Sequence, residues 1–526
     1  MSNIDDSEIQ LLKEAITKAE QFKGKIKMRS PNIKKILSIL EKYIIKKKLI
    51  CYGGTAINNI LPKKDQFYNK DIELPDYDVF SPNAINDIKE IADYFSKNGY
   101  TEVEAKSGMH LGTYKLYINF LPILDLTQLN TDIYTTIKKD SLKVNNILYA
   151  PPNFLRMSMY GELSKPFGDN SRWEKVLKRL IILNNNYPIK LSCNSNYLFR
   201  HPDKEINKNI FTIINNYIIK KKFVFFGGYA TSLYKKYMSE KIKNKLNTFP
   251  IMDVLCKNIP LAINDIKNLL KSYNVNIIKH KGIDDLIEDH YEVKVNDTTI
   301  LFLYYPLSCH SYNTLKYNNK IVRIATIDTM FSFYLLFIYL NRDYYDVNRI
   351  LCMVKYLFML QNKNRLKKKG LLRRFTLSCY GEQQEIEDIK SKKAEMYKKL
   401  KHNKRSLEYK KWFLKYVPKN KDKSKTNTIF NSLTNPKTLS KPKTLSKPKI
   451  KANPKTLSKS KSKTSSKAKS KTSSKAKSKT LFKAKFKTSS KAKSKTSSKA
   501  KSKTLSKPKT LSKHKVLYNT KKIKKK

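Results

Sequence analysis

The stretch YIIKKKLICYGGTA, residues 43–56, returns later in the chain as YIIKKKFVFFGGYA, residues 217–230. A second shared word, AINDIK, follows each copy, at residues 84–89 and 262–267. Two matching words in the same order are not expected from composition alone. The sequence therefore predicts an internally duplicated chain.

Hydrophobic patterning gives both copies a similar order of elements. In the first copy the expected elements are helix 33–47, strand 49–52, helix 55–61, strand 76–80, helix 83–97, strands 112–118 and 121–126, and a largely helical segment 151–186. In the second they are helix 204–219, strand 223–226, a helix after Gly228, strand 251–255, helix 261–273, strands within 290–304 and helices within 327–361. We therefore expect an α/β protein with two tandem lobes, each a mixed sheet with helices.

The expected domain boundaries follow from this pattern and from the length of 526 residues. They are an N-terminal helix in 1–30, a first lobe at 31–190, a second lobe at 191–375, a charged helical extension at 376–420 and a Lys-rich tail at 421–526. Apolar residues at near-helical spacing within 5–22 predict that the N-terminal helix is packed against the protein.

The chain is strongly basic, with a formal net charge of +65. Residues 421–526 hold 37 Lys and one acid, Asp422, so the tail supplies about +36 and the rest of the chain about +29. The repeats of the tail, such as KTLSKPK and KAKSKTSS, contain few aromatic residues, so we expect the tail to be disordered. A flexible polycation binds nucleic acid by releasing counterions, although a solubilising or packaging role is the alternative.

The six cysteines are scattered singly and form no CxxC pair, a pattern that favours a reducing compartment. The start MSNIDDSE does not resemble a secretory signal. The most apolar run, MFSFYLLFIYL at 330–340, is shorter than the ~20 residues that a bilayer requires. We expect a soluble intracellular protein that does not bind membranes.

The junction at Gly53 and Gly54 connects an apolar strand directly to a helix. Glycine lets the backbone approach a phosphate closely, and a helix N-terminus presents free N–H groups to an anion. Together with the Thr55 hydroxyl, the two glycines are candidates to hold a triphosphate. The structural alternative is a tight connection without a ligand.

The segment LPDYDVF, residues 74–80, carries Asp76 and Asp78 two positions apart on a predicted strand. Side chains at this spacing project from the same face, so both carboxylates can bind the same divalent cations. Without cations or protons they repel each other. The alternative is a solvent-facing edge strand.

A third acid, Asp125, lies inside the apolar strand FLPILDL, residues 120–126. A carboxylate buried there is costly unless it is paired or bound to a metal. The alternative is an acid on the exposed side of a half-buried strand. Three carboxylates that hold two cations can activate a hydroxyl and stabilise a leaving diphosphate.

These residues resemble the signature of polymerase-β-like nucleotidyltransferases: Gly-Gly opening a helix, Asp-x-Asp on a strand and a third Asp on a later strand. Residues 30–415 more narrowly resemble the poly(A) polymerase catalytic subunits of large cytoplasmic DNA viruses, of the poxvirus and mimivirus type. The segments GDNSRWEKVLKRLIILNNNYP at 168–188 and RRFTLSCYGE at 373–382 support this resemblance. The tail lies outside it.

The resemblance implies that Asp76 and Asp78 bind two Mg²⁺ or Mn²⁺ ions, and that Asp125 binds one of them and acts towards the primer 3′-hydroxyl. It implies Arg172 and Lys175 as contacts to nucleotide or RNA, although an Arg and a Lys on a helix are usually solvated. ATP would be the substrate, RNA 3′ ends the partner and the host cytoplasm the location, within a viral factory, with packaging in the virion as an option. A homodimer or a processivity partner is compatible with it.

The second copy keeps Gly227 and Gly228 but loses the carboxylate set. Asp253 aligns with Asp78, Ile251 takes the place of Asp76, and no Asp or Glu occurs from 298 to 327, where the counterpart of Asp125 belongs. One carboxylate cannot organise two metals. The second lobe is therefore predicted to be degenerate and catalytically inactive.

The leading hypothesis is template-independent addition of AMP to RNA 3′ ends. The alternatives are another terminal nucleotidyltransferase, adding uridylate or CCA, and a non-enzymatic nucleic-acid-binding or packaging protein that acts through its tail. Adenine specificity rests on the resemblance alone.

Overall fold

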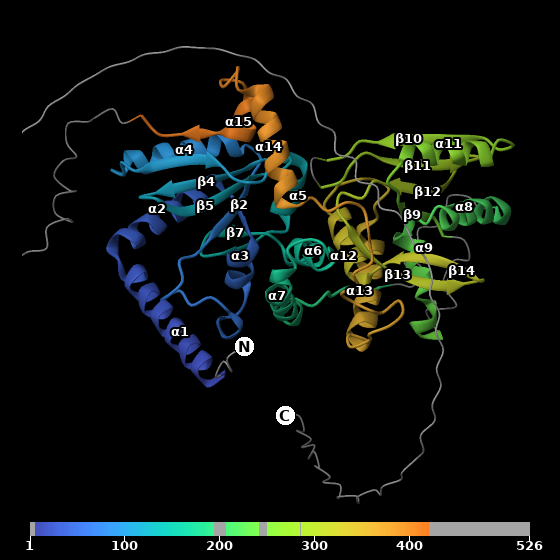
Figure 1. The fold of residues 1–526 in the computed structure, drawn as a ribbon, viewed down its shortest axis with the longest axis horizontal. Coiled ribbons are helices and arrows are strands. Elements are labelled where there is room, and N and C mark those ends of the chain that lie inside the picture. The colour runs from blue at the N-terminus through green and yellow to red at the C-terminus, as the bar shows by residue number, and fades with distance from the viewer. Residues whose placement is uncertain (1–5, 194–206, 241–249, 284–285, 420–526) are drawn as a thin grey trace, which may run out of the picture. The chain divides into compact units, whose positions relative to one another are not determined.

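The computed structural model describes residues 6–193, 207–240, 250–283 and 286–419 (Figure 1). The tail predicted to be disordered, 421–526, lies outside these residues. By compactness the chain divides into two units, residues 1–436 and 437–526, and all the described residues belong to the first. None of its described helices is both long and apolar enough to cross a membrane.

An eight-stranded mixed sheet is built mainly from the first copy. Its spatial order is β16 (Lys415–Tyr416), β3 (Val103–Ser107), β4 (Thr113–Ile118), β5 (Leu121–Gln128), β2 (Tyr77–Ser81), β1 (Ile50–Tyr52), β7 (Ile147–Tyr149) and β6 (Leu142–Val144). β2 runs antiparallel to β1 and parallel to β5, and β1 runs parallel to β7.

The second copy forms a sheet with the same topology. Its spatial order is β10 (Val275–His280), β11 (His290–Val295), β12 (Thr298–Tyr304), β9 (Met252–Leu255), β8 (Val224–Phe225), β14 (Lys320–Ala325), β13 (His310–Tyr317) and β15 (Cys379–Tyr380). Seven strands correspond one to one between the sheets, and only the eighth, β16 or β15, joins a different edge. The predicted duplication and the α/β fold class are confirmed.

The helices of the second copy follow the order of those in the first, but helices 6–29 and 131–139 have no counterpart among the described residues. Those of the first copy are α1 (Asp6–Arg29), α2 (Pro31–Lys47), α3 (Gly53–Ile60), α4 (Ala84–Lys97), α5 (Thr131–Lys139), α6 (Pro152–Leu163) and α7 (Trp173–Asn186). Those of the second are α8 (Lys208–Lys220), α9 (Gly227–Leu233), α11 (Ile259–Leu269), α12 (Ile327–Phe337) and α13 (Val347–Lys363), and α14 (Ile386–Leu400) and α15 (Leu407–Phe413) follow. Short 3₁₀ helices lie at η1 (Lys63–Asp65), η2 (Asn170–Arg172) and η4 (Lys235–Tyr237).

Four two-residue turns rich in Asn connect the hairpins of the two sheets. At 119–120, 145–146, 296–297 and 318–319 both residues have positive φ, between 46° and 65°. Such a turn matches the twist of the flanking strands, and Asn tolerates the left-handed conformation better than most residues. The hairpin registers of both copies therefore depend on the same local chemistry.

Equivalent helices of the two copies, α6 and α12, pack against each other (Figure 1). The rings of Tyr160 and Phe331 meet edge to face at 4.7 Å between centroids, and those of Phe154 and Tyr339 at 5.5 Å. Both contacts are buried. Because aromatic pairs bury large apolar areas, this helix pair joins the lobes through a continuous core.

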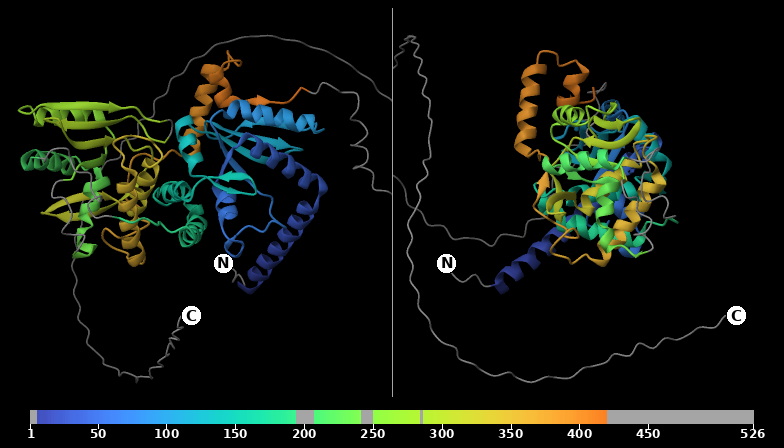
Figure 2. Two further views of the ribbon diagram at one scale, coloured as in Figure 1. Left: turned by 180° about the vertical axis from the view of Figure 1, so that it is seen from behind. Right: turned by 90° about the vertical axis from the view of Figure 1, so that its right-hand side faces the viewer.

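The N-terminal helix differs from the expectation. α1 extends to Arg29 and has no buried residue, and Leu11 and Phe22 are 68% and 66% exposed. Figure 2 shows α1 projecting from the rest of the first lobe. The prediction of a packed helix is wrong because helical spacing reveals an apolar face but not what covers it.

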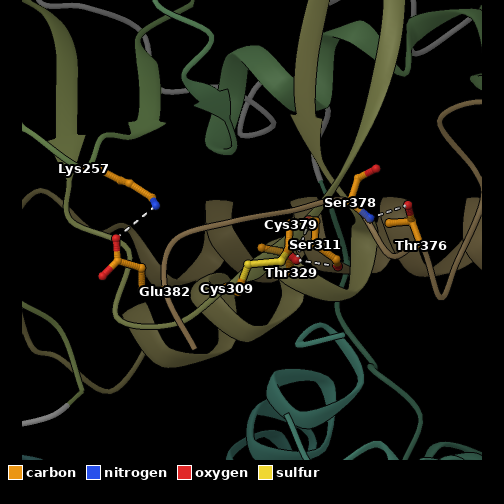
Figure 3. Close-up of a disulfide and its surroundings, with 8 residues drawn as sticks. All are labelled: Lys257, Cys309, Ser311, Thr329, Thr376, Ser378, Cys379 and Glu382. Carbon is orange, nitrogen blue, oxygen red and sulfur yellow. Dashed lines mark hydrogen bonds and ion pairs between the residues drawn. A yellow bond between two sulfur atoms is a disulfide. The ribbon is translucent and has the colours of Figure 1, made fainter. Parts of the chain in front are cut away.

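Four of the six cysteines are paired, which differs from the expectation of isolated thiols. Disulfides join Cys193 to Cys352 and Cys309 to Cys379, the second beside Ser311 and Thr329 on β13 and α12 (Figure 3). The partners are 159 and 70 residues apart in sequence, so local spacing carried no signal for them.

The segment after the second lobe connects both sheets. β15 pairs with β13 of the second sheet, and β16 pairs with β3 of the first. Between them, Lys393 Nζ on α14 donates to the carbonyl of Gly108 at 2.7 Å, and after α15 Tyr416 Oη donates to Asp93 at 2.6 Å. The helical extension is therefore anchored on the first lobe.

The RRFTLSCYGE segment supplies a buried ion pair. Arg374 Nε and Nη2 donate to the two carboxylate oxygens of Asp328, at 2.9 and 2.6 Å, and Gln361 Nε2 donates to the same carboxylate at 3.2 Å. The side chains of Asp328 and Arg374 are only 2% and 13% exposed. The segment is thereby fastened to α12 and α13.

Replacing Arg374 with Met is expected to destabilise the protein by about 3 kcal/mol, because it leaves the Asp328 carboxylate buried without its cation. Thermal unfolding measures this. Lys178→Met is the control, because the Lys178–Glu174 pair is exposed and should contribute little to stability. The double variant Asp328→Leu/Arg374→Met should recover part of the loss, and equal stability of Arg374→Met and the parent would contradict the assignment.

Candidate active site

The Gly-Gly junction is required by a close approach between strands. Gly53 begins α3 directly after β1 with φ of +72°, and a Cβ there would collide with the carboxylate of Asp78 on the adjacent strand β2. A side chain at this position would therefore displace one of the candidate catalytic acids. Glycine is needed both for the backbone conformation and for the space.

The three predicted carboxylates come together on neighbouring strands. Asp78 and Asp125 are register partners in the parallel pair β2–β5, and Asp76 directly precedes β2. Asp78 is half-buried, whereas its neighbours Tyr77 and Val79 are buried on the opposite face. Thr55 Oγ1 donates to the backbone carbonyl of Asp76 at 2.6 Å, so this hydroxyl positions the strand, and its contact with phosphate stays a prediction.

Burial and mutual repulsion raise the pKa values of Asp76 and Asp78. Desolvation, followed by the charges of Asp76 and Asp125, raises the pKa of Asp78 to about 7. Desolvation and the charge of Asp125 also raise the pKa of Asp76, against the opposing effect of Lys115 and Lys175. Ionisation of Asp76 and Asp78 is therefore unfavourable unless positive charge is supplied.

Lys115, which no sequence motif singled out, supplies part of that charge. It is the register partner of Asp125 on β4, and its Nζ lies 2.5 Å from Asp125 Oδ2. Burial disfavours its charge, but the hydrogen bond and charge of Asp125 outweigh burial and raise the Lys115 pKa. From the sequence alone, a Lys at an alternating position of a strand cannot be told from one that points into solvent, because the strand register is not known.

The carboxylate cluster suits hard divalent cations. Among the residues described, no group of three or more His, Cys, Asp or Glu side chains is arranged to hold a metal ion. The donor chemistry nevertheless fits, since all three groups are carboxylates, as Mg²⁺ and Mn²⁺ prefer. The raised Asp78 pKa and the ammonium group against Asp125 both indicate a demand for cations here.

Basic residues at the start of α7 lie near the acids. Arg172 favours the ionised form of Asp78 and Lys175 that of Asp76 through their charges. Arg172 Nη2 also lies 3.4 Å from Glu162 Oε1, and its side chain is 53% exposed. Both predicted residues are therefore near the carboxylates, and their contact with nucleotide or RNA stays a prediction.

A further cation, Arg179, lies against the Gly-Gly junction. Its Nη2 donates to Tyr68 Oη at 2.6 Å, and its guanidinium lies 4.7 Å from the centroid of the Phe67 ring. A Cβ on Gly54 would lie 2.5 Å from Tyr68 Oη and 2.9 Å from Arg179 Nη1. Tyr68, on the long loop after α3, thus holds a second Arg, from α7, beside the glycines proposed to bind the triphosphate, which spacing alone did not reveal.

That loop is fixed by a buried amide. Asn58 on α3 is 1% exposed, and its Oδ1 accepts from the backbone N–H groups of Phe67 and Tyr68 at 2.8 and 2.9 Å. The loop between α3 and Asp76 is therefore held against α3 by Asn58.

The second lobe has the same backbone but different side chains. Gly227 has φ of +71° and lies against Asp253, as Gly53 lies against Asp78. The register partner of Asp253 is Phe302, which stands where Asp125 stands in the first lobe. Glu292, the partner of Phe302, takes the place of Lys115.

Aromatic rings fill the corresponding face of the second lobe. His290 stacks on Tyr304 at 4.8 Å, and Phe226 stacks on Phe333 at 4.8 Å. The cavity beside Gly227 and Asp253 has a volume of only about 20 Å³. A triphosphate with two metals does not fit there, which supports the predicted loss of catalysis.

Comparison with known proteins agrees with these observations. Residues 38–169 match the family model "Poly(A) polymerase catalytic subunit". A protein of African swine fever virus, provisionally named a poly(A) polymerase catalytic subunit, is 30% identical over 202 residues, which is 36% of this chain and 42% of the relative. A protein of Acanthamoeba polyphaga mimivirus with the same provisional name is 24% identical over 313 residues, 55% of this chain and 50% of the relative.

The chain thus spans half or less of the length of these relatives. The crystal structure of the Megavirus polyadenylate synthase has the same fold, with a TM-score of 0.67 at 17% identity over 80% of this chain and 86% of that chain. The resemblance inferred from the motifs is confirmed, and the first lobe, at residues 38–169, matches the poly(A) polymerase catalytic subunit family.

Proposed function

We propose that this chain is a template-independent poly(A) polymerase, which transfers AMP from ATP to the 3′ end of RNA. The observation that carries the proposal is the carboxylate cluster of the first lobe beside Gly53, within the segment that matches the family. In the reaction the 3′-hydroxyl oxygen bonds to the α-phosphorus of ATP, the hydroxyl proton leaves, and diphosphate departs.

In this proposal Asp76 and Asp78 hold two divalent ions, and Asp125 holds one of them on the side of the primer. Two Mg²⁺ or Mn²⁺ ions, when bound, would activate the hydroxyl and stabilise the departing diphosphate. Lys115 compensates the charge of Asp125 in the absence of substrate.

The triphosphate would lie at the start of α3, where Gly53 and Gly54 allow close approach to backbone N–H groups. Arg172, Lys175 and Arg179 would neutralise its charge from α7, and Arg as a planar donor suits phosphate oxygens. We further propose that the enzyme acts on viral mRNA in the host cytoplasm, with a second copy or a processivity partner to extend the RNA track.

Replacing Asp76 or Asp78 with Ala should lower nucleotide addition by roughly 10³-fold, because the charge that holds the cations is lost. Asp253→Ala should leave most activity, since the second lobe has one acid and no room for a triphosphate. Extension of a labelled RNA primer, with each nucleoside triphosphate in turn and Mg²⁺ or Mn²⁺, measures both.

Incorporation of UMP, or of CMP followed by AMP, in preference to AMP alone would favour uridylate or CCA addition. Loss of activity in Asp253→Ala, with thermal stability intact, would contradict the assignment of the lobes. Asp253→Asn serves as the shape-preserving control.

Deleting residues 421–526 distinguishes the enzyme from a packaging protein. An enzyme should keep primer extension but bind RNA more weakly and with a smaller salt dependence, because the tail contributes about +36 of charge. A binder that works through its tail should lose RNA binding altogether and show no extension before or after deletion.

Asp78→Asn should stabilise the metal-free protein by about 2 kcal/mol at pH 8 while abolishing activity. The folded-state pKa of Asp78, about 7, lies above its usual value near 3.9, so ionised Asp78 opposes folding at high pH. This penalty falls as the pH drops from 7 towards 4, so the benefit of the substitution should be small at pH 5.

Thermal unfolding in EDTA at pH 5 and pH 8 measures the effect. Asp71→Asn, at an exposed position in the loop before β2, is the control and should change little at either pH. Destabilisation by Asp78→Asn at pH 8 would contradict the proposed repulsion.

A further inference from the structure

A cavity of about 540 Å³ is bounded by elements from both lobes. Its walls come from α6, the turn between β3 and β4, the segment joining β12 to β13, and helices α12, α14 and α15. Its lining includes none of the candidate catalytic residues. It is large enough to hold a nucleotide.

Two lining residues relate this cavity to the first lobe's site. β5 and β4, with Asp125 and Lys115, lie on one side of β2, and β1 with Gly53 lies on the other. His110, in the turn before β4, lines the cavity. So does Glu162, which lies 3.4 Å from Arg172. Through Glu162 the cavity wall therefore reaches Arg172, whose charge acts on Asp78, so the cavity lies beside the carboxylate site.

One polar atom in the wall lacks a partner. His310 is 7% exposed and lines the cavity, and its Nδ1 makes no hydrogen bond with any described residue. Burial, followed by the charge of Lys165, lowers the His310 pKa to about 3, so the ring is neutral and offers a donor or an acceptor.

The position of His310 is fixed by covalent and strand contacts. The neighbouring Cys309 is disulfide-bonded to Cys379 (Figure 3). His310 is the register partner of Tyr380 across β13 and β15. The unpartnered imidazole is therefore held at the wall by the second sheet.

The remaining wall combines cations with aromatic rings. Tyr305 is 42% exposed at the cavity, and Lys392 on α14 is exposed with its Nζ 6.0 Å from the centroid of the buried Trp412 ring. Lys165 adds a second ammonium group from the end of α6. Exposed rings beside cations are how proteins hold unpaired bases and their phosphates.

We propose that this cavity binds a nucleotide of the RNA primer upstream of its 3′ end, with the base against Tyr305 and the backbone phosphate at Lys392. The inference rests on the proposed function for RNA as the substrate. The extension that carries α14 and α15 thereby completes the primer site.

Tyr305→Ala and Lys392→Met test the proposal in the full-length protein. Tyr305→Ala is expected to raise the primer KM about tenfold, as loss of one stacked base implies, and to leave the ATP KM unchanged. Tyr305→Phe should restore the parent value because it keeps the ring. Lys392→Met should lower the slope of log Kd against log salt by about one, and Lys398→Met, exposed on the same helix but outside the cavity, should not.

A cross-linking measurement distinguishes RNA binding at this cavity from RNA binding by the tail and from catalysis. RNA primers with 4-thiouridine one to three nucleotides from the 3′ end, irradiated with the protein in EDTA, should cross-link to the peptide that contains Tyr305, and less so in Lys392→Met. Failure of nucleotide addition with this cross-link intact would reject the proposed function but keep the RNA site. An unchanged primer KM without the cross-link, or a raised ATP KM in Tyr305→Ala, would overturn the site itself.

Discussion

The structure of the first lobe depends on the repulsion between carboxylates held on neighbouring strands. Parallel pairing of β2 and β5 fixes Asp78 opposite Asp125, and Asp76 lies at the start of the same strand. The neighbouring features follow from that constraint. Gly53 leaves room for the Asp78 carboxylate, Lys115 is paired with Asp125, and the first turns of α7 direct positive charge at the cluster. A site that opposes its own ionisation is prepared to take up cations, because they relieve a cost already present in the fold.

The second lobe has the same strand order as the first but lacks the pair of facing carboxylates. Phe302 at the position of Asp125 removes the acid opposite Asp253, and Glu292 replaces Lys115, since no carboxylate requires a cation there. The face then fills with stacked rings such as those of His290 and Tyr304. Strand order and turn chemistry persist, so the lobe keeps its fold while its pocket closes. Its contribution is to pack α12 on α6 and to supply one wall of the cavity beside the first lobe's acids.

The sequence was sufficient for the features that local rules govern. The repeated words predicted the duplication, which the matching sheets confirm. Asp76 lies directly before β2, which begins at Tyr77, so its sharing a strand face with Asp78 stays a prediction. The strands around 145–146 and 318–319 were missed, although their Asn-Asn turns are a recognised hairpin signal. The roles of Lys115 and Arg179 required the strand register and the path of a long loop, which no local pattern encodes. The exposed face of α1 and the two cysteine pairs also depend on contacts between segments far apart in sequence.

The segment after the second lobe links the two lobes of the duplicated fold. The chain leaves the second sheet at β15, which the Cys309–Cys379 disulfide ties to β13, and reaches the edge of the first sheet at β16. A segment held at both ends restrains the separation of the lobes, as does the α6–α12 core. The cavity that it covers takes walls from both lobes, so its shape depends on their packing. Under the proposed function, an inactive second lobe would have a catalytic role, because it would give the first lobe a rigid wall against which a flexible single strand is held. Rigidity would lower the entropic cost of aligning the end of that strand with Asp125.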